Sequence, residues 1–298
     1  MTLIETPLCQ RQPQILAGDQ AIALMHTLAA RLADGTLIPY LGPGVLPAGD
    51  GPPATPEALA DYFGSRVALP RRAKGNAWAA AQQIESNRHR STLAAIMADA
   101  FAVPVEPTGL HHCLARLAPP MIVDSWYDGA MRRALSSRSA DCGVWGEVQG
   151  TTRSAIGESR WYRFFDNEGS EVGEAVAEGW STLLYKPHGG IEPAKACLIS
   201  DADYVEVLTE IDIQTPIPNV VKQIRSDRSF LYIGCRFHDQ LLRTYARQIA
   251  KRSSGAHYAV VDPASLTRNE LRFLESQNIR VLNLGLAEVT AILEASAF

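Results

Sequence analysis

The sequence predicts an α/β fold: a doubly wound, Rossmann-like parallel sheet of about six strands with a small helical insert. Short apolar segments alternate with amphipathic segments of helical periodicity, most regularly in the last third of the chain. This alternation is typical of parallel strands joined by helices that cover both faces of the sheet. The 298 residues are enough for one large domain, 1–298, that also holds inserted segments.

The N-terminal part contains a helix, the first strand and the helical insert. We expect a helix over 18–35 and an apolar strand over 36–42, followed by a loop rich in Pro and Gly. Thr55 and Pro56 are of the residue types that cap a helix and begin its first turn. Helix-forming residues continue from there, so 55–118 is expected to form a helical insert after the first strand.

The central part contains two further strands separated by a less regular segment. "PPMIVDS" (119–125) and "TLLYKPHGG" (182–190) each combine a short apolar run with turn-forming residues. Residues 136–180 are rich in Gly, Ser, Trp and Arg, and we expect them to form an irregular, β-containing insert. In the C-terminal third, three apolar segments are each followed by an amphipathic helix. The expected strands therefore lie near residues 37, 121, 183, 230, 258 and 280.

Composition and charge exclude several classes of protein. The net charge is −4 and the basic clusters are short, so nucleic-acid binding is not expected. No apolar run approaches the length of a membrane span, and the N-terminus lacks the pattern of a secretory signal. The five cysteines form no CxxC pair, which argues against a zinc module, and their odd number argues against a disulfide framework. No metal site is expected. We expect a cytoplasmic protein with reduced thiols.

The turn after the first strand is the first candidate binding element. In "IPYLGPGVL", Gly42, Pro43, Gly44 and Val45 follow the strand directly. Glycines allow a sharp turn and let a phosphate approach backbone N–H groups. The third glycine of a dinucleotide-binding motif is missing, and Pro43 lacks an N–H donor. A tight turn without a ligand therefore stays an open alternative to a pocket floor.

The ends of the second and third strands carry further candidates. Trp126 and Asp128 follow the second strand, and Asp128 either caps the next helix or faces a pocket. His188 lies in a glycine-rich turn after the third strand. Its imidazole either points into a cleft or makes a structural hydrogen bond.

The last strands add one glycine and two acids. Gly234 offers a second point of close backbone approach, and Asp239 either lines the pocket or caps the next helix. Asp262 is placed to accept hydrogen bonds from ribose hydroxyls, or belongs only to a turn. Because the carboxyl ends of parallel strands meet at one edge of a sheet, these residues together predict a nucleotide pocket.

These segments resemble the sirtuin-like domain family, in its bacterial branch without a zinc-binding module. The resemblance covers roughly 36–285 and is carried by "YLGPGV", "SWYDGAMRRAL", "LLYKPHG", "SDADYVEVL" and "SFLYIGCRFHDQLLR". Members of that family bind NAD across the carboxyl ends of the strands, and they either transfer acyl groups to ADP-ribose or hydrolyse NAD.

The resemblance implies a role for each matching position. Gly42 and Gly44 would lie against the phosphates of NAD, and His188 would match the catalytic histidine, a general base for a ribose hydroxyl or water. Gly234 and Asp239 would line the far side of the pocket, and Asp262 would bind the adenosine ribose. The resemblance implies NAD, or an ADP-ribose-like nucleotide, as the ligand.

Three positions depart from the family pattern. Pro43 replaces an alanine, Leu46 a serine and Trp126 an asparagine that helps to hold the water or ribose. An indole offers one donor and no acceptor, and it is large enough to fill the nicotinamide end of a pocket. The missing cysteine quartet argues against protein deacylation.

Three functions stay open from the sequence. The first is NAD cleavage, as an NAD glycohydrolase or an ADP-ribosyl transferase, through His188. The second is a module that binds the nucleotide without cleaving it and reports to a protein partner. The third is a scaffold for protein contacts or a homo-oligomer, with Trp145, Trp161 and Tyr162 as either an exposed contact surface or part of the core.

Overall fold

A single mixed sheet forms the centre of the fold. The computed structural model describes residues 13–47, 49, 51–151, 161–213 and 217–296. Within them, ten strands join in the order β1-β12-β11-β10-β2-β3-β7-β4-β5-β6. In this order, every neighbouring pair from β1 through β12, β11, β10, β2, β3 and β7 to β4 is parallel. At the other edge, β5 pairs antiparallel with β4, and β6 pairs antiparallel with β5. The strands are β1 (Ile15–Ala17), β2 (Leu37–Leu41), β3 (Met121–Asp124), β4 (Trp145–Gly150), β5 (Tyr162–Asp166), β6 (Glu171–Val172), β7 (Thr182–Lys186), β10 (Ser229–Ile233), β11 (His257–Val260) and β12 (Ile279–Asn283).

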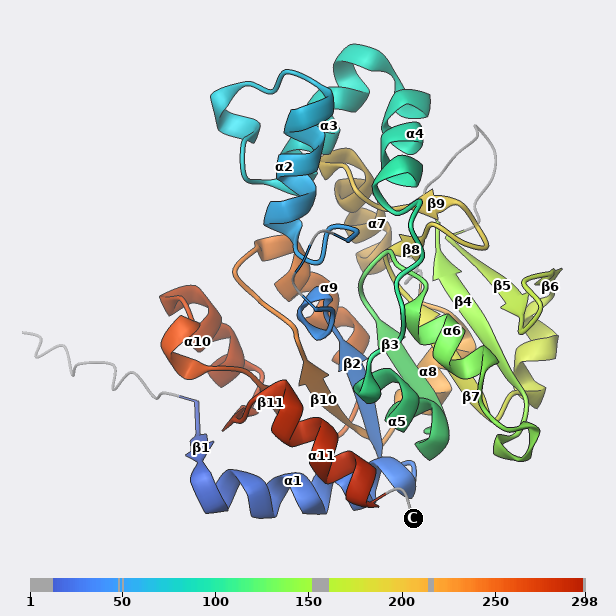
Figure 1. Ribbon diagram of the computed structural model, residues 1–298, viewed down its shortest axis with the longest axis vertical. Coiled ribbons are helices and arrows are strands. Elements are labelled where there is room, and N and C mark those ends of the chain that lie inside the picture. Colours follow the sequence, from blue (N-terminus) through green and yellow to red (C-terminus); the bar gives the residue numbers. More distant parts are fainter. Residues whose placement is uncertain (1–12, 48, 50, 152–160, 214–216, 297–298) are drawn as a thin grey trace, which may run out of the picture.

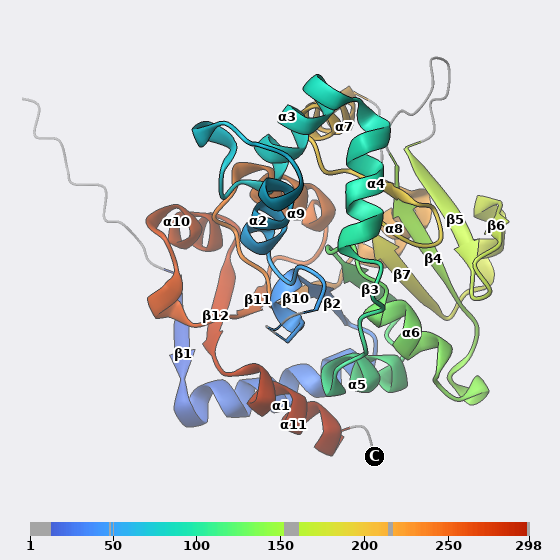
Figure 2. The same ribbon diagram turned by 45° about the horizontal axis from the view of Figure 1, so that its top comes forward.

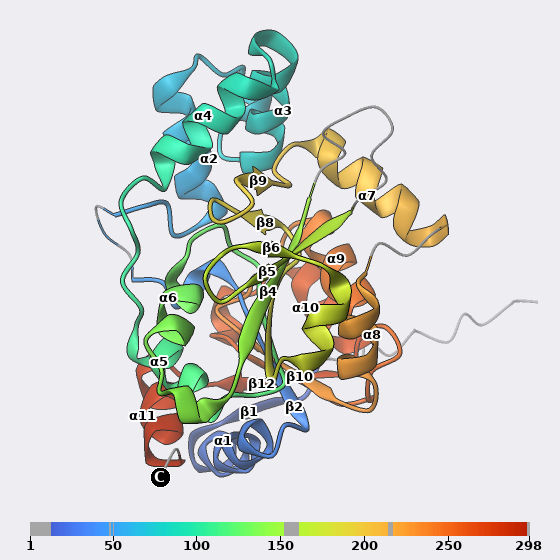
Figure 3. The ribbon, with the colours of Figure 1, turned by 90° about the vertical axis from the view of Figure 1, so that its right-hand side faces the viewer.

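Helices cover both faces of this sheet (Figure 1). One layer contains α1, α11, α5 and α6, and the other contains α8, α9 and α10 (Figure 3). The two layers explain why β2, β3, β7, β10 and β11 consist entirely of buried residues. The helices of these layers are α1 (Gly18–Ala33), α5 (Gly109–Leu117), α6 (Ala130–Ser136), α8 (Asn219–Arg225), α9 (Gln240–Ala250), α10 (Arg268–Ser276) and α11 (Leu286–Ser296).

A third group of helices lies over the carboxyl ends of the strands (Figure 2). It consists of α2 (Pro56–Arg66), α3 (Ala77–Arg88) and α4 (Arg90–Ala100), and α3 also contacts α7 (Asp201–Ile213). The side chain of Thr55 accepts a hydrogen bond from Ala58 N at 3.1 Å, as expected of a residue that caps α2. A short hairpin of β8 (Gly189–Gly190) and β9 (Ala196–Cys197) lies beside this group.

The α/β class and the parallel sheet are confirmed, but the predicted number of about six strands was too low. The six expected strands are β2, β3, β7, β10, β11 and β12. The additional strands are β1, a three-residue edge strand, and β4 to β6, which arise within 136–180. The strands β4 to β6 lie in the segment that was expected to contain β structure, whereas β1 was not predicted, because a strand of three residues carries a weak periodic signal. None of the helices in the described ranges is long and apolar enough to cross a bilayer.

The chain changes direction across the sheet between β2 and β10. From β2 the chain proceeds to β3 on one side, whereas from β10 it proceeds to β11 on the other. The two strands are paired, with Leu41 opposite Ile233 at their carboxyl ends. In open α/β sheets, such a switch point leaves a crevice outside the strand ends in which ligands bind.

Candidate functional site

A cavity of about 490 Å³ opens at the switch point. It lies where the turns after β2 and β10 meet the segment after β3 and the start of α2. Its wall combines aromatic rings, glycine backbone and a few polar side chains. The lining residues are Tyr40, Gly42, Pro43, Gly44, Thr55, Pro56, Glu57, Ser125, Trp126, Gly234, Cys235, Arg236, Phe237, His238, Leu242 and Thr267.

The glycines of the two turns pack directly against each other. A Cβ atom on Gly42 would lie 2.4 Å from the Gly234 carbonyl oxygen. Gly234 has a φ of +66°, and a Cβ there would lie 2.5 Å from the Val45 nitrogen. No real Cβ atom tolerates such contacts with backbone, so both positions require glycine. Gly42, Pro43 and Gly44 line the cavity, whereas Val45 is buried behind them.

The backbone amides of this turn are already engaged. Gly42 N donates to Ile233 O and Gly44 N donates to Gly234 O, each at 2.9 Å. Pro43 has no N–H to offer. A phosphate at this cavity therefore needs donors other than the amides of Gly42 and Gly44, and the glycines act by allowing close packing of the two turns.

Trp126 forms an apolar part of the cavity wall. Its only side-chain donor, Nε1, donates to Pro53 O at 2.9 Å. The ring packs against Tyr127 at a centroid distance of 5.0 Å and against Phe101 at 6.3 Å, and the residue is 4% exposed. The indole thus joins the segment after β3 to the loop before α2.

An ion pair between a buried carboxylate and a partly exposed arginine holds a guanidinium at the cavity, and the sequence analysis did not predict it. Arg236 Nε donates to Glu270 Oε1 at 2.8 Å and its Nη2 donates to Oε2 at 2.9 Å. Phe237 N and Thr267 also donate to this carboxylate. Burial alone would raise the pKa of Glu270, but these hydrogen bonds lower it to about 2. The capping box of Thr267 and Glu270 can be recognised in the sequence as "TRNE". The pairing of Glu270 with Arg236, which lies 34 residues earlier, leaves no such sequence pattern.

His188 is buried rather than exposed to the cavity. The residue is 2% exposed and is absent from the cavity lining. Its Nδ1 lies 3.0 Å from the Tyr204 hydroxyl, and its ring contacts Tyr245 at a centroid distance of 4.6 Å. Its Nε2 has no hydrogen-bond partner among the described residues. Burial, with a smaller contribution from Lys186, lowers the pKa of His188 to about 3, so its imidazole is neutral at pH 7.

Lys186 joins the ends of β7 and β3 inside the protein. Its Nζ donates to Asp124 Oδ2 at 2.6 Å and to Asp128 O at 2.9 Å. Asp128 Oδ1 accepts from Ala130 N at 2.8 Å at the start of α6, as expected of a helix cap. Burial, and then the charge of Asp124, raise the pKa of Asp128 to about 6. Asp128 lines a separate cavity of about 390 Å³ beside Arg132.

The two remaining predicted acids lie outside the switch-point cavity. Asp239 accepts from Leu241 N at 2.7 Å as the N-cap of α9. Asp262 is exposed and accepts from Ala264 N at 2.9 Å in the turn after β11. Both therefore satisfy the helix-cap and turn alternatives, and neither lines the cavity.

Trp145 and Trp161 are 4% and 8% exposed, so of the two alternatives the core holds for these residues and the exposed contact surface does not. Tyr162 is partly buried against Phe164. The 136–180 segment therefore contributes core rather than an aromatic contact surface at these positions.

Across the described ranges there is no group of three or more His, Cys, Asp or Glu side chains that could hold a metal ion.

Comparison with known proteins identifies a family. The family model described as "SIR2-like domain" matches residues 120–282, which is more than half of the chain. The matched region contains Trp126, Asp128, His188, Gly234 and Arg236, while the glycine turn after β2 precedes it. A search of curated proteins found no match.

Proposed function

We propose that this chain, which belongs to the SIR2-like family, binds NAD or an ADP-ribose-type nucleotide in the switch-point cavity. The family is generally NAD-related. The observation that carries the proposal is the position of the cavity, between the turns after β2 and β10, where open α/β sheets bind their ligands. Its volume of about 490 Å³ lies in the range of small-molecule and cofactor sites.

The chemistry of the wall fits a nucleotide. Trp126 and Phe237 offer apolar ring surface for a base or a nicotinamide. Arg236 offers a cation, and two of its nitrogens are occupied by Glu270 and Ser265 O. Its Nη1 makes no hydrogen bond within the described part of the chain and carries two N–H donors. Arginine N–H groups bind phosphate oxygens strongly, so Arg236 supplies the donors that the glycine amides lack.

Binding is tested by calorimetric titration with NAD and with ADP-ribose. Arg236→Lys keeps a cation beside Glu270 but removes the unpaired Nη1 group. A lost charge-assisted hydrogen bond corresponds to a roughly 10- to 100-fold weaker Kd. Arg272→Lys, at an exposed position on the same α10 helix that holds Glu270, should leave Kd unchanged. Folded protein that binds neither nucleotide, or an Arg236→Lys variant with the original Kd, would refute this site.

A second candidate function is cleavage of NAD through His188. The observation that favours it is the unpartnered Nε2 atom, since buried polar atoms are rarely left without a partner unless they serve a ligand, a water or a reaction. The imidazole is neutral at pH 7 and so can accept a proton, but a pKa of about 3 makes it a weaker base than a histidine that titrates near pH 7. Trp126, in place of the family's asparagine, supplies no acceptor to help hold a water or ribose.

Cleavage is tested by following free nicotinamide by chromatography. The expected result is release by the native chain, and loss of at least about 100-fold in His188→Ala, the usual contribution of a general base. His26→Ala, at an exposed position of α1, is the matched control and should keep the activity. Release that survives in His188→Ala would exclude this histidine as the base, and no release by native protein that binds NAD would leave binding as the function.

A further inference from the structure

His188 lies at one end of a chain of buried hydroxyl groups. Its Nδ1 is 3.0 Å from Tyr204 Oη, which is 3.4 Å from Tyr127 Oη. Tyr127 Oη is 2.7 Å from the carbonyl oxygen of Leu198. Burial raises the pKa of both tyrosines, so each hydroxyl keeps its proton and can donate only one hydrogen bond. The directions of these bonds decide which nitrogen of His188 carries the proton.

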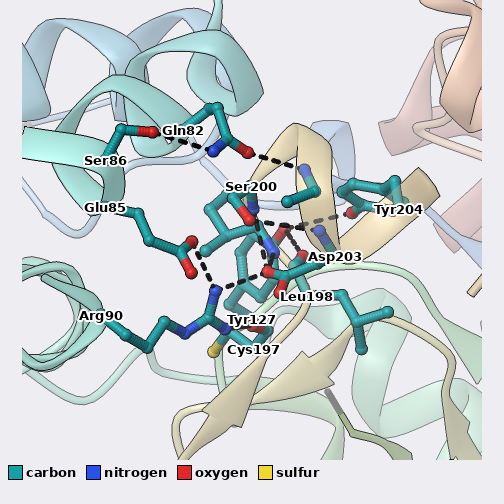
Figure 4. Close-up of polar contacts among 12 residues, drawn as sticks. Gln82, Glu85, Ser86, Arg90, Tyr127, Cys197, Leu198, Ser200, Asp203 and Tyr204 are labelled. Carbon is teal, nitrogen blue, oxygen red and sulfur yellow. Dashed lines mark hydrogen bonds and ion pairs between the residues drawn. The ribbon is translucent and has the colours of Figure 1, made fainter. Parts of the chain in front are cut away.

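The direction of the chain is fixed at its far end. A carbonyl oxygen only accepts, so the Tyr127 hydroxyl donates to Leu198 O. The oxygen of Tyr127 is then left to accept from Tyr204. Figure 4 shows Tyr127, Leu198 and Tyr204 grouped at the start of α7.

Tyr204 is held in place by its neighbour in the sequence. Asp203 Oδ2 accepts from Arg90 Nη1 at 2.7 Å, from Ile199 N at 2.9 Å and from Ser200 N at 3.0 Å (Figure 4). These bonds fix the first turn of α7 against α4 and the segment after β9. The Tyr204 hydroxyl therefore lies 3.0 Å from His188 Nδ1 on a helix turn that several hydrogen bonds hold in place.

Two arrangements of protons are compatible with these distances. In the first, His188 Nδ1–H donates to Tyr204, Tyr204 donates to Tyr127, and Tyr127 donates to Leu198 O. This gives three hydrogen bonds, of which the one between the two tyrosines is long at 3.4 Å and therefore weak. In the second, Tyr204 donates to Nδ1, which gives two hydrogen bonds and places the proton of His188 on Nε2. Nε2 has no partner among the described residues, so the second arrangement buries an unsatisfied donor. Buried donors without partners are rarer than buried acceptors without partners, and the first arrangement also has one more bond.

We infer that Tyr204 is a positioning residue that holds His188 in the tautomer protonated at Nδ1, which leaves Nε2 as the basic nitrogen. The lone pair of Nε2 is then the only free hydrogen-bonding site on the ring. In cleavage of NAD, Nε2 takes one proton from the attacking water, whose oxygen bonds to C1′ of the ribose while the bond from C1′ to nicotinamide breaks. Nicotinamide leaves as a neutral molecule with the bonding electron pair, and the ring becomes an imidazolium that still donates from Nδ1 to Tyr204. This last step rests on the proposed cleavage function, whereas the tautomer itself does not.

The tautomer is measured by NMR on protein labelled with ¹⁵N-histidine, because the protonated and unprotonated ring nitrogens have well-separated shifts. His188→Gln identifies the resonances of His188. The expected result for the native chain is a protonated Nδ1 and an unprotonated Nε2. A protonated Nε2 in native protein would overturn the inference, whatever the activity.

Two tyrosine variants test the hydroxyl chain. Tyr127 makes no hydrogen bond to His188, but Tyr127→Phe removes the oxygen that accepts from Tyr204. Both arrangements then have the same number of hydrogen bonds. We expect the ratio of Nδ1-protonated to Nε2-protonated His188 to fall on the order of 10-fold. Tyr245→Phe is the matched control, since that ring also contacts His188 but its hydroxyl makes no hydrogen bond to it in the described part of the structure. Its ratio should equal that of the native chain. An unchanged ratio in folded Tyr127→Phe would overturn the inference. If native protein releases nicotinamide, Tyr127→Phe should also release it more slowly than Tyr245→Phe. A native chain without release but with a protonated Nδ1 refutes cleavage and supports the assigned tautomer.

Discussion

The contact between the two glycine turns predicts a graded loss of stability on substitution with alanine. Three glycines separate the two possible causes. Gly18 has a φ of +54° with no atom within 4 Å of a built Cβ, Gly42 has a close backbone contact without a positive φ, and Gly234 has both. Gly18→Ala therefore reports backbone strain alone, Gly42→Ala reports steric conflict alone, and Gly234→Ala reports their sum.

The magnitudes follow from the distances. Strain in the left-handed region costs about 1–2 kcal/mol, and the reduced entropy of the unfolded chain offsets part of it, so Gly18→Ala should lose roughly 1 kcal/mol. In Gly42→Ala, the Cβ lies 2.4 Å from a carbonyl oxygen, and the two turns must separate. This movement adds the cost of overpacking to the weakening of two backbone hydrogen bonds, in total about 3 kcal/mol. Gly234→Ala should lose about 4 kcal/mol.

The free energy of unfolding is measured by urea denaturation, followed by tryptophan fluorescence. Gly255→Ala serves as a control, because a Cβ there meets open space and its φ is not positive. Its stability should stay within about 0.5 kcal/mol of the native chain. Gly42→Ala combined with Gly234→Ala should cost less than the sum of the two, since both disturb one contact. A Gly42→Ala variant as stable as Gly18→Ala would refute the reasoning.

Two further predictions concern buried ionisable groups. Lys186→Met leaves Asp124 buried without its cationic partner and should lower the free energy of unfolding by about 3–5 kcal/mol. Adding Asp124→Asn should restore part of that loss. Equal urea midpoints for the single and double variants would contradict this. Burial lowers the pKa of His111 and His257 to about 4 and that of His188 to about 3. Because the unfolded chain binds protons on these residues below about pH 6.5, stability present at pH 7 is lost as pH falls toward 4, by roughly 2 kcal/mol each at pH 5. His257→Gln should reduce the drop in unfolding free energy between pH 7.5 and pH 5; a drop as large as in the native chain would show that His257 has no such role.

Much of the fold and part of the site were predictable because they depend on local chemistry. Hydrophobic periodicity gives the six main strands, since a strand buried on both faces must be apolar throughout. Helix caps such as Thr55 and Asp239 follow from side-chain oxygens within reach of the next turn. The segments after the strands also carried the family resemblance, which the match over 120–282 confirmed.

The partners of these residues could not be predicted, because they come from distant parts of the chain. The sequence places Gly42 in a turn, but only the pairing of β2 with β10 brings it against Gly234. The close packing of these two turns is therefore a role of Gly42 that the sequence alone could not show. Arg236 and Glu270 meet only when the turn after β10 reaches the start of α10.

The sequence by itself therefore determined the α/β class, the main strands and which residues follow them. The tertiary structure decided what those residues contact. His188 is buried beside Tyr204 rather than open to the cavity, and the side chain of Trp126 donates its one hydrogen bond to Pro53 O. The physical reason is that periodicity and capping act over a few residues. Burial, close backbone contact and the direction of a hydrogen-bond chain are instead set by atoms that only folding brings together.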